Sequence, residues 1–222
     1  MDHRKKVLKL IEAGVFLLVL AACSIPSVIP ITAPTSSSAA TFTNSSDFQA
    51  AISTLGVPTI INFDDMDASP VNNTFIGRSP FDGHTYSRQG ITFSNPKGFL
   101  LYITPGGLFW NTSNSLSVGQ FPYDPNGSKN ETDDDLFVTL DPPVVAIGFN
   151  LVDYSTYNQD EFVRFVDING NVVKQLPLPQ PSSTSRTFVG IISMDRSITR
   201  INIAEDANDD DDVNYDDFIF VP

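Results

Sequence analysis

The feature that most constrains the fold is a succession of short apolar runs, each bounded by Gly, Pro, Asn or Asp. Such runs are typical of β-strands, and no stretch of useful length repeats its apolar residues at the helical period. An antiparallel two-sheet sandwich is therefore predicted, with a closed barrel as the second option. The expected strands are Thr59–Phe63, Gly90–Ser94, Phe99–Ile103, Ser115–Val118, Leu136–Leu140, Val144–Val152, Phe162–Val166, Asn171–Leu176, Thr187–Met194, Ile198–Ala204 and Phe218–Val221.

Turn and cap residues predict how some of these runs are joined. The segment 167–170, Asp-Ile-Asn-Gly, predicts a tight hairpin because Asn and Gly both accept the positive φ angles that such a turn needs. One short helix is expected over 47–52, with Ser46 as its N-cap and Gln49 at the capping-box position. The longest loops are expected at 72–89, 104–114 and 120–135, and such loops commonly carry binding residues.

The first 22 residues have the pattern of an export signal. A basic group at 4–6 precedes the apolar segment 13–22, which is too short to span a membrane. Residues 20–23, Leu-Ala-Ala-Cys, have the sequence of a bacterial lipobox, in which the cysteine is diacylated before the signal peptide is removed. Cys23 is the only cysteine in the chain, so it has no partner for an intramolecular disulfide. Lipidation of Cys23 is expected, and an ordinary secretory signal with an unmodified cysteine is the alternative.

The rest of the chain divides into a tether and a domain. Ser, Thr, Pro and Ala dominate the segment 24–46, which predicts an extended tether. The expected organisation is a signal peptide at 1–22, a lipidated cysteine with its tether at 23–46, and a β-sandwich domain at 47–222. The expected location is the extracytoplasmic face of a bacterial cell envelope, with membrane lipid as a partner through Cys23. Ser24 rather than Asp after the cysteine favours the outer membrane if the cell has one.

The charge of the chain excludes one class of partner. The full chain has 13 basic and 26 acidic residues, a net charge of −13. Removal of residues 1–22 leaves 9 basic and 24 acidic residues and a net charge of −15. Because such a domain repels polyanions, nucleic acid is excluded as a partner, and divalent cations are the natural counter-ions.

The order of the strand motifs carries a resemblance. The motifs are FDD at 63–65, GITF at 90–93, NSLS at 114–117, PVVAIGF at 143–149, FVGI at 188–191, the run 198–203 and DDFIF at 216–220. In this order they resemble the β-sandwich ectodomain of exported bacterial surface proteins, many of which carry a C-terminal PEP-CTERM sorting tail. The resemblance covers 47–222 and implies a jelly-roll-like, lectin-like shape with no settled activity. This chain departs from the group in lacking that tail, which leaves the lipobox as its expected anchor.

The acidic residues predict a structural calcium site. Asp206, Asn208 and Asp210 have the alternate spacing of a calcium loop, although Asp211 stands where an EF-hand needs Gly. A second group consists of two pairs that adjoin apolar strands, and its carboxylates would converge if the first and last strands are neighbours. These pairs are Asp64 with Asp65 and Asp216 with Asp217. The alternative is that these residues only end strands, form Asx turns and stay solvated.

Aromatic residues predict a carbohydrate site. Tyr102, Phe109 and Trp110 surround the Gly-rich turn 104–107, and aromatic faces beside polar groups are typical of ligand sites. The alternative is that these rings pack in the core or within the loop, where Phe and Trp are usually found.

A non-catalytic binding module, for polysaccharide and stabilised by calcium, is the function that these features favour. A structural or adhesive envelope protein without a small ligand is the second candidate. A glycan hydrolase is the third, because it needs only two carboxylates. His84 is the only histidine after residue 22, and the chain contains neither a GxSxG nor an HExxH sequence.

Overall fold

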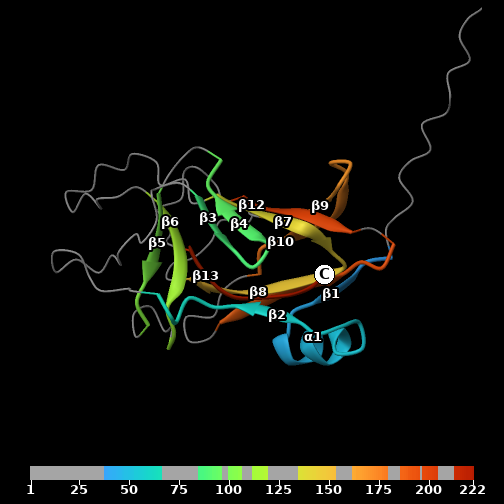
Figure 1. Cartoon of the computed structure of the whole chain (residues 1–222), viewed down its shortest axis with the longest axis horizontal. Coiled ribbons are helices and arrows are strands. Elements are labelled where there is room, and N and C mark those ends of the chain that lie inside the picture. The colour runs from blue at the N-terminus through green and yellow to red at the C-terminus, as the bar shows by residue number, and fades with distance from the viewer. Residues whose placement is uncertain are drawn as a thin grey trace, which may run out of the picture. The chain divides into compact units, whose positions relative to one another are not determined.

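The computed structural model describes residues 38–66, 85–96, 100–106, 112–119, 135–153, 162–179, 186–195, 197–204 and 213–222. These residues form two antiparallel sheets packed face to face, with one helix beside them (Figure 1). The predicted all-β, antiparallel two-sheet sandwich with one short helix is confirmed. Within the described part of the chain, no helix has the length and apolar character needed to cross a membrane.

The larger sheet has seven strands in the order β1-β11-β8-β13-β6-β5, and β2 also pairs with β13. All of its strand pairs are antiparallel. The last strand therefore lies near the centre of this sheet, where it is hydrogen-bonded on both sides. The strands are β1 (Ala40–Phe42), β2 (Thr59–Ile61), β5 (Leu100–Thr104), β6 (Ser115–Gly119), β8 (Ala146–Asp153), β11 (Thr187–Ile192) and β13 (Val213–Val221).

The smaller sheet has six strands in the order β10-β9-β12-β7-β4-β3. In β4, β7 and β12, buried residues alternate with partly or fully exposed ones, so one face packs on the seven-stranded sheet and the other faces outward. The strands are β3 (Thr85–Arg88), β4 (Ile91–Ser94), β7 (Leu136–Val144), β9 (Phe162–Asp167), β10 (Val172–Pro177) and β12 (Ile198–Ala204).

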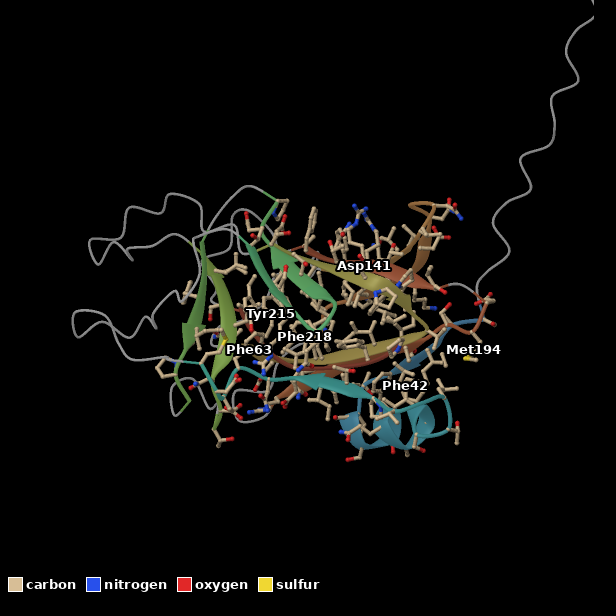
Figure 2. All side chains as sticks on the ribbon, in the orientation of Figure 1. Phe42, Phe63, Asp141, Met194, Tyr215 and Phe218 are labelled. Atoms are coloured by element: carbon tan, nitrogen blue, oxygen red, sulfur yellow. The ribbon has the colours of Figure 1, made fainter. Side chains whose placement is uncertain are left out.

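Aromatic side chains fill the space between the two sheets. The ring of Phe218 lies 4.9 Å from that of Phe93 and 5.2 Å from that of Phe149, measured between centroids. Phe63 packs at 5.8 Å from Phe93, and Figure 2 shows Phe63, Tyr215 and Phe218 grouped in the layer between the sheets. All five rings are fully buried, and burial of one such side chain contributes about 1.5–3 kcal/mol.

The helix α1 (Ser45–Ile52) covers the outer face of the seven-stranded sheet, beneath β8 and β1 in Figure 1. Its buried Phe48 and Ile52 pack there against a second apolar cluster that includes Ala146, Phe188 and Val221. This side of the sandwich is therefore an additional small core.

The helix begins earlier than predicted. Asn44 is the N-cap, and its Oδ1 accepts hydrogen bonds from the backbone N–H groups of Ser46 at 2.8 Å and Asp47 at 3.1 Å. The prediction of Ser46 as N-cap was wrong because an Asn in an extended conformation stands two residues before it and satisfies the free N–H groups first. Gln49 donates through its side chain to Oγ of Ser45 at 3.0 Å.

Three strand segments fall where none was expected. β1 lies in the segment assigned to the tether and pairs with β11, so the folded part of the chain begins before residue 47. β3 lies in the segment expected to be the loop 72–89. The first half of β13, from Val213, extends the last strand into the acidic stretch.

Two hairpins follow from local turn residues. The chain turns between β9 and β10 as predicted, with Gly170 at φ +80° and Asn169 outside the positive-φ region. Asp167 holds this turn, because its Oδ1 accepts from the N–H groups of Asn169 at 2.9 Å and Asn171 at 2.8 Å. Between β3 and β4, Gln89 and Gly90 have φ values of +51° and +87°, which is the pattern of a two-residue type I′ turn.

Candidate functional site

The predicted acidic pair at the end of the chain lies at an irregularity in β13. Asp216 is paired with Asn150 of β8 and Ile219 with Gly148, so two residues of β13 face one residue of β8. Asp217 has a φ of +48°, which Asp tolerates better than most residues. On its other edge, β13 pairs with β6 before this bulge and with β2 after it. The bulge therefore marks the point where β13 changes partner.

Asp216 is a completely buried carboxyl group. Its Oδ2 accepts a 2.5 Å hydrogen bond from Oγ of Ser113, and its Oδ1 accepts from the backbone N–H of Asp217 at 2.8 Å. Nη1 of Arg186 lies 3.3 Å from its Oδ2. Burial is the largest influence and raises the pKa of Asp216, and the neighbouring Asp217 charge also raises it. The hydrogen bonds from Ser113 and from the Asp217 N–H and the charge of Arg186 oppose the rise, and the resulting pKa is about 6.

Asp217 points to the same guanidinium group. Its Oδ2 lies 2.7 Å from Nη1 of Arg186 and accepts a hydrogen bond from Nδ2 of Asn150 at 2.9 Å. Arg186 also donates to Oγ of Ser113. The two carboxylates thus share one cation, and the network joins β13, β8 and the segments that precede β6 and β11.

The other predicted pair, Asp64 and Asp65, follows β2 after two intervening residues. Oδ1 of Asp64 accepts from the backbone N–H of Asn114 at 2.9 Å. The side chain of Asn114 donates to the carbonyl oxygens of Phe63 and Met66 and accepts from the N–H of Gly106. Asp65 instead faces the six-stranded sheet, where both of its oxygens accept from Arg88, at 2.7 and 2.9 Å.

The condition for the carboxylates to converge, that the first and last expected strands are neighbours, is met, because Ile61 of β2 is paired with Phe218 of β13. The four carboxylates are accommodated there by Arg88, Arg186 and hydrogen-bond donors of the protein. Among the residues that the structure describes, no three His, Cys, Asp or Glu side chains are grouped as a metal site. Asp206, Asn208 and Asp210 lie outside the described residues, and a calcium ion stays a prediction.

The predicted aromatic site is described only at Tyr102. This half-buried residue of β5 is in register with Ser117 of β6, which is in turn in register with Asn214 of β13. Ser117 and Asn214 are buried and hydrogen-bonded to each other, and Thr104 contacts Ser117 at 2.6 Å. Phe109, Trp110, His84 and the lipidation residue Cys23 lie outside the described residues.

A different polar surface, which the sequence analysis did not predict, covers the outer face of the six-stranded sheet. Two rows of residues cross all six strands in cross-strand register. α1, the one helix among the described residues, lies on the opposite side of the sandwich (Figure 1). The first row is Thr85, Ser94, Phe137, Asn202, Arg164 and Gln175, and the second is Ser87, Thr92, Thr139, Arg200, Val166 and Val172.

Two arginine–aromatic contacts organise this face. The guanidinium carbon of Arg164 lies 4.5 Å from the ring centroid of Phe162, and that of Arg200 lies 5.8 Å from the ring centroid of Phe137. Nε and Nη2 of Arg164 also donate to Oε1 of Gln175, each at 3.0 Å. Oδ1 of Asn202 is buried and has no hydrogen-bond partner.

A pocket of about 250 Å³ opens on the second row. It lies beside a bulge in β12, where the pairing with β9 shifts between Ile198 and Arg200. The exposed side chain of Ile168 forms part of one wall. Its lining consists of Thr139, Leu140, Val166, Asp167, Ile168, Gly170, Thr199 and Arg200.

The alternation of apolar and polar residues along β9 and β12 is the sequence feature from which this surface could have been predicted. Arg164 and Arg200 stand between buried apolar residues of these strands, in a chain with twice as many acidic as basic residues. Their meeting depends on the pairing of β9 with β12, which the local pattern does not show.

The fold and these surfaces define the chain as an all-β sandwich domain with a polar, arginine-bearing sheet face. No family model matches the sequence, and no curated protein matches it. Among solved structures, the K2 cleaved adhesin domain of Lys-gingipain superimposes with a TM-score of 0.43 at 10% identity, over 74% of this chain and 98% of that one.

Carbohydrate-binding modules are also among the similar structures. A family 29 module variant complexed with cellulohexaose has a TM-score of 0.28 at 11% identity, over 73% of this chain and 90% of its own. A family 29 module from Piromyces equi has a TM-score of 0.28 and covers 73% of this chain and 89% of its own. With TM-scores below 0.5, these likenesses assign no family to this chain.

Proposed function

We propose that this chain is an exported, lipid-anchored, non-catalytic binding module, and that it holds carbohydrate on the outer face of the six-stranded sheet. The observation that supports the proposal is the composition of that face. It combines hydroxyl and amide groups in cross-strand register with the rings of Phe137 and Phe162 and a pocket beside Arg200. Polar groups that fix orientation beside apolar surface are the usual makeup of small-ligand sites.

The acidic junction of β13 supports a structural role better than a catalytic one. A glycosidase needs two carboxyl groups that both reach the substrate. The side chain of Asp216 is 0% exposed, and its two oxygens are engaged by Ser113 and Asp217. This carboxyl group therefore joins strands and does not face a ligand.

Glycan-array binding by the full chain in detergent tests the proposed function. Replacement of Phe137 by Ala should reduce binding at least about tenfold, because the ring supports Arg200 and contributes apolar contact area. Phe42→Ala, on the opposite side of the sandwich, is the matched control and should bind normally.

The same array locates the site. Binding that is lost with Trp110→Ala and kept with Phe137→Ala would move the site to the aromatic group predicted around Tyr102, Phe109 and Trp110. Absence of binding to any glycan would refute the carbohydrate proposal and favour the structural or adhesive alternative.

The anchor and the ion are separate parts of the proposal. Labelled palmitate should be incorporated into the wild-type protein and not into Cys23→Ser. Incorporation that survives this change would refute the lipid anchor at Cys23.

A structural calcium ion in the segment with Asp206, Asn208 and Asp210 should raise the melting temperature in calcium above the melting temperature in chelator. An unchanged midpoint would refute it.

A further inference from the structure

Four arginines lie in the part of the chain that the structure describes, and they fall into two classes. Arg88 is ion-paired with Asp65, and Arg186 with Asp216 and Asp217. Arg164 and Arg200, both on the outer face of the six-stranded sheet, have no described carboxylate within ion-pair distance. The chain carries 26 acidic residues, yet these two guanidinium groups on one face lack a described acidic partner. They can therefore receive an anionic ligand.

The register places these two guanidinium groups on neighbouring strands. Arg164 of β9 is paired with Asn202 of β12, and Arg200 of β12 is paired with Val166 of β9. The arginines are therefore diagonal neighbours on one face, at a typical separation of roughly 7–8 Å between such positions. Asn202 stands beside both of them in this arrangement, and its side-chain oxygen lacks a donor from the protein.

Each guanidinium group is supported from one side by a ring. The contacts of Arg164 with Phe162 and of Arg200 with Phe137 leave N–H donors of Arg200 without a described protein acceptor. Arg200 also borders the 250 Å³ pocket, together with Thr139 and Thr199. A ligand carboxylate at Arg200 would thus have hydroxyl groups and the apolar side chain of Ile168 beside it.

The nearby carboxylates do not cancel this charge. Asp167 is 7% exposed, and both of its oxygens accept hydrogen bonds within the β9–β10 turn. Asp141 lies two residues beyond Thr139 on β7 and makes no ion pair with a described residue. At physiological salt, charges more than about 8 Å away are largely screened, so the net negative charge of the chain does not prevent contact at this face.

We infer that the ligand of this face is an acidic polysaccharide whose carboxylate groups, as in a uronic acid, are bound by Arg200 and Arg164. The inference rests on the proposed function and gives the class of carbohydrate. The paired N–H donors of Arg200 match the two oxygens of a carboxylate, and Arg164, whose Nε and Nη2 already donate to Gln175, adds its charge and its Nη1 donors. The hydroxyl and amide groups of Thr139, Thr199 and Asn202 match the sugar hydroxyls.

Binding of the full chain to immobilised polygalacturonate, alginate and hyaluronan tests the inference. Arg200→Gln and Arg164→Gln should each weaken binding at least about tenfold, because each removes a charge-assisted contact. Lys174→Gln, on the neighbouring strand β10, removes the same charge and should leave binding unchanged. Full methyl esterification of polygalacturonate, which caps its carboxylates, should abolish binding.

Equal binding of the acid and its methyl ester, or binding only to neutral glycans, would overturn the inference while the proposed function stands. No binding to any acidic or neutral glycan would overturn both. Equal weakening by Lys174→Gln and Arg200→Gln would also overturn the inference, because it would show a general charge effect.

Discussion

Oγ of Ser113 donates a 2.5 Å hydrogen bond to Oδ2 of Asp216, a residue 103 positions further along the chain. Ser113 stands just before β6, and Asp216 stands at the bulge where β13 exchanges β6 for β2. The hydrogen bond thus joins the segment before β6 to β13 at the bulge, where the neighbour of β13 changes from β6 to β2. Because Asp216 is completely buried, this junction makes the stability of the domain depend on one ionisable group.

The first prediction concerns pH. The folded-state pKa of Asp216, about 6, is above the unfolded value of 3.8, so the folded protein binds this proton more tightly than the unfolded chain does. The stabilisation from Asp216 is therefore fully present below about pH 4 and is lost as the pH rises through about 6. Over this range the contribution changes by roughly 2–3 kcal/mol.

Urea unfolding of wild type and Asp216→Asn between pH 4 and pH 7.5 measures this effect. The variant should become more stable relative to wild type as the pH rises, since it has no proton to lose. Ser113→Ala, which removes a donor to the carboxylate, should destabilise the protein more at pH 7.5 than at pH 4. A constant difference between wild type and Asp216→Asn across the range would contradict the assignment of the raised pKa to this residue.

The second prediction concerns Asn114, which joins the segments around β2, β5 and β6. Its side chain makes three hydrogen bonds, to Gly106, Phe63 and Met66. Asn114→Ala should reduce the free energy of unfolding by roughly 1–3 kcal/mol, since buried or half-buried hydrogen bonds contribute about 1 kcal/mol each. Chemical denaturation at neutral pH gives the value.

Asn171→Ala is the matched control, because Nδ2 of this exposed turn residue donates one hydrogen bond of 3.2 Å, to Oδ2 of Asp167. Its cost should stay below about 1 kcal/mol. An equal loss in the free energy of unfolding for the two variants would show that Asn114 contributes no more to stability than an ordinary turn residue does.

The strands that the sequence predicts correctly are those with a strong apolar alternation. β12, for example, was predicted at its observed bounds, because its alternate residues Ile201 and Ile203 are fully buried. β3 was missed because its sequence, TYSR, has a single apolar side chain and is held at a sheet edge by a tight turn. β1 was missed because three residues in a Ser- and Thr-rich segment become a strand only through pairing with β11.

The candidate site likewise has features that the local sequence shows and features that depend on contacts between distant segments. Carboxylate pairs beside the first and last expected strands could be recognised from the sequence, and the structure pairs those two strands as β2 and β13. The partners of those residues could not, since Arg186 lies 31 positions from Asp217 and Arg88 lies 23 positions from Asp65. Only the sheet register brings these opposite charges together, and it gives Asp65, Asp216 and Asp217 arginine partners from within the protein.

The third prediction concerns Gly190 of β11, which lies opposite Gly148 of β8. A Cβ atom at Gly190 would lie 2.7 Å from Cε1 of Phe188 and 3.0 Å from Cδ2 of Phe48. Phe48 is a buried residue of α1 and Phe188 packs in the same cluster between α1 and the sheet, so neither ring moves without loss of packing. Gly190→Ala should therefore reduce the free energy of unfolding by about 1–3 kcal/mol.

The double variant Gly190→Ala with Phe188→Leu separates steric conflict from other causes. If the ring is the obstacle, the double variant should be more stable than the sum of the two single effects predicts, as measured by urea unfolding. Strict additivity would show that the added methyl group acts on something other than Phe188.

The last prediction concerns the pair of Asp65 and Arg88, which links the segment after β2 to β3 of the other sheet. Both oxygens of Asp65 accept from Arg88, and this hydrogen bonding, opposed by slight desolvation, lowers the pKa of Asp65. Its side chain is 61% exposed, so we expect Arg88→Lys, which loses the paired geometry, to cost less than about 1 kcal/mol. Because the folded-state pKa is lowered, the stabilisation is present at neutral pH and is lost as the pH falls below the usual range of an Asp carboxyl group. Thermal melting of Asp65→Asn should thus show a deficit at pH 7 that shrinks as the pH falls through the acid range, opposite in sign to the pH dependence of Asp216. A deficit that stays constant into acid would refute the ion pair as its cause.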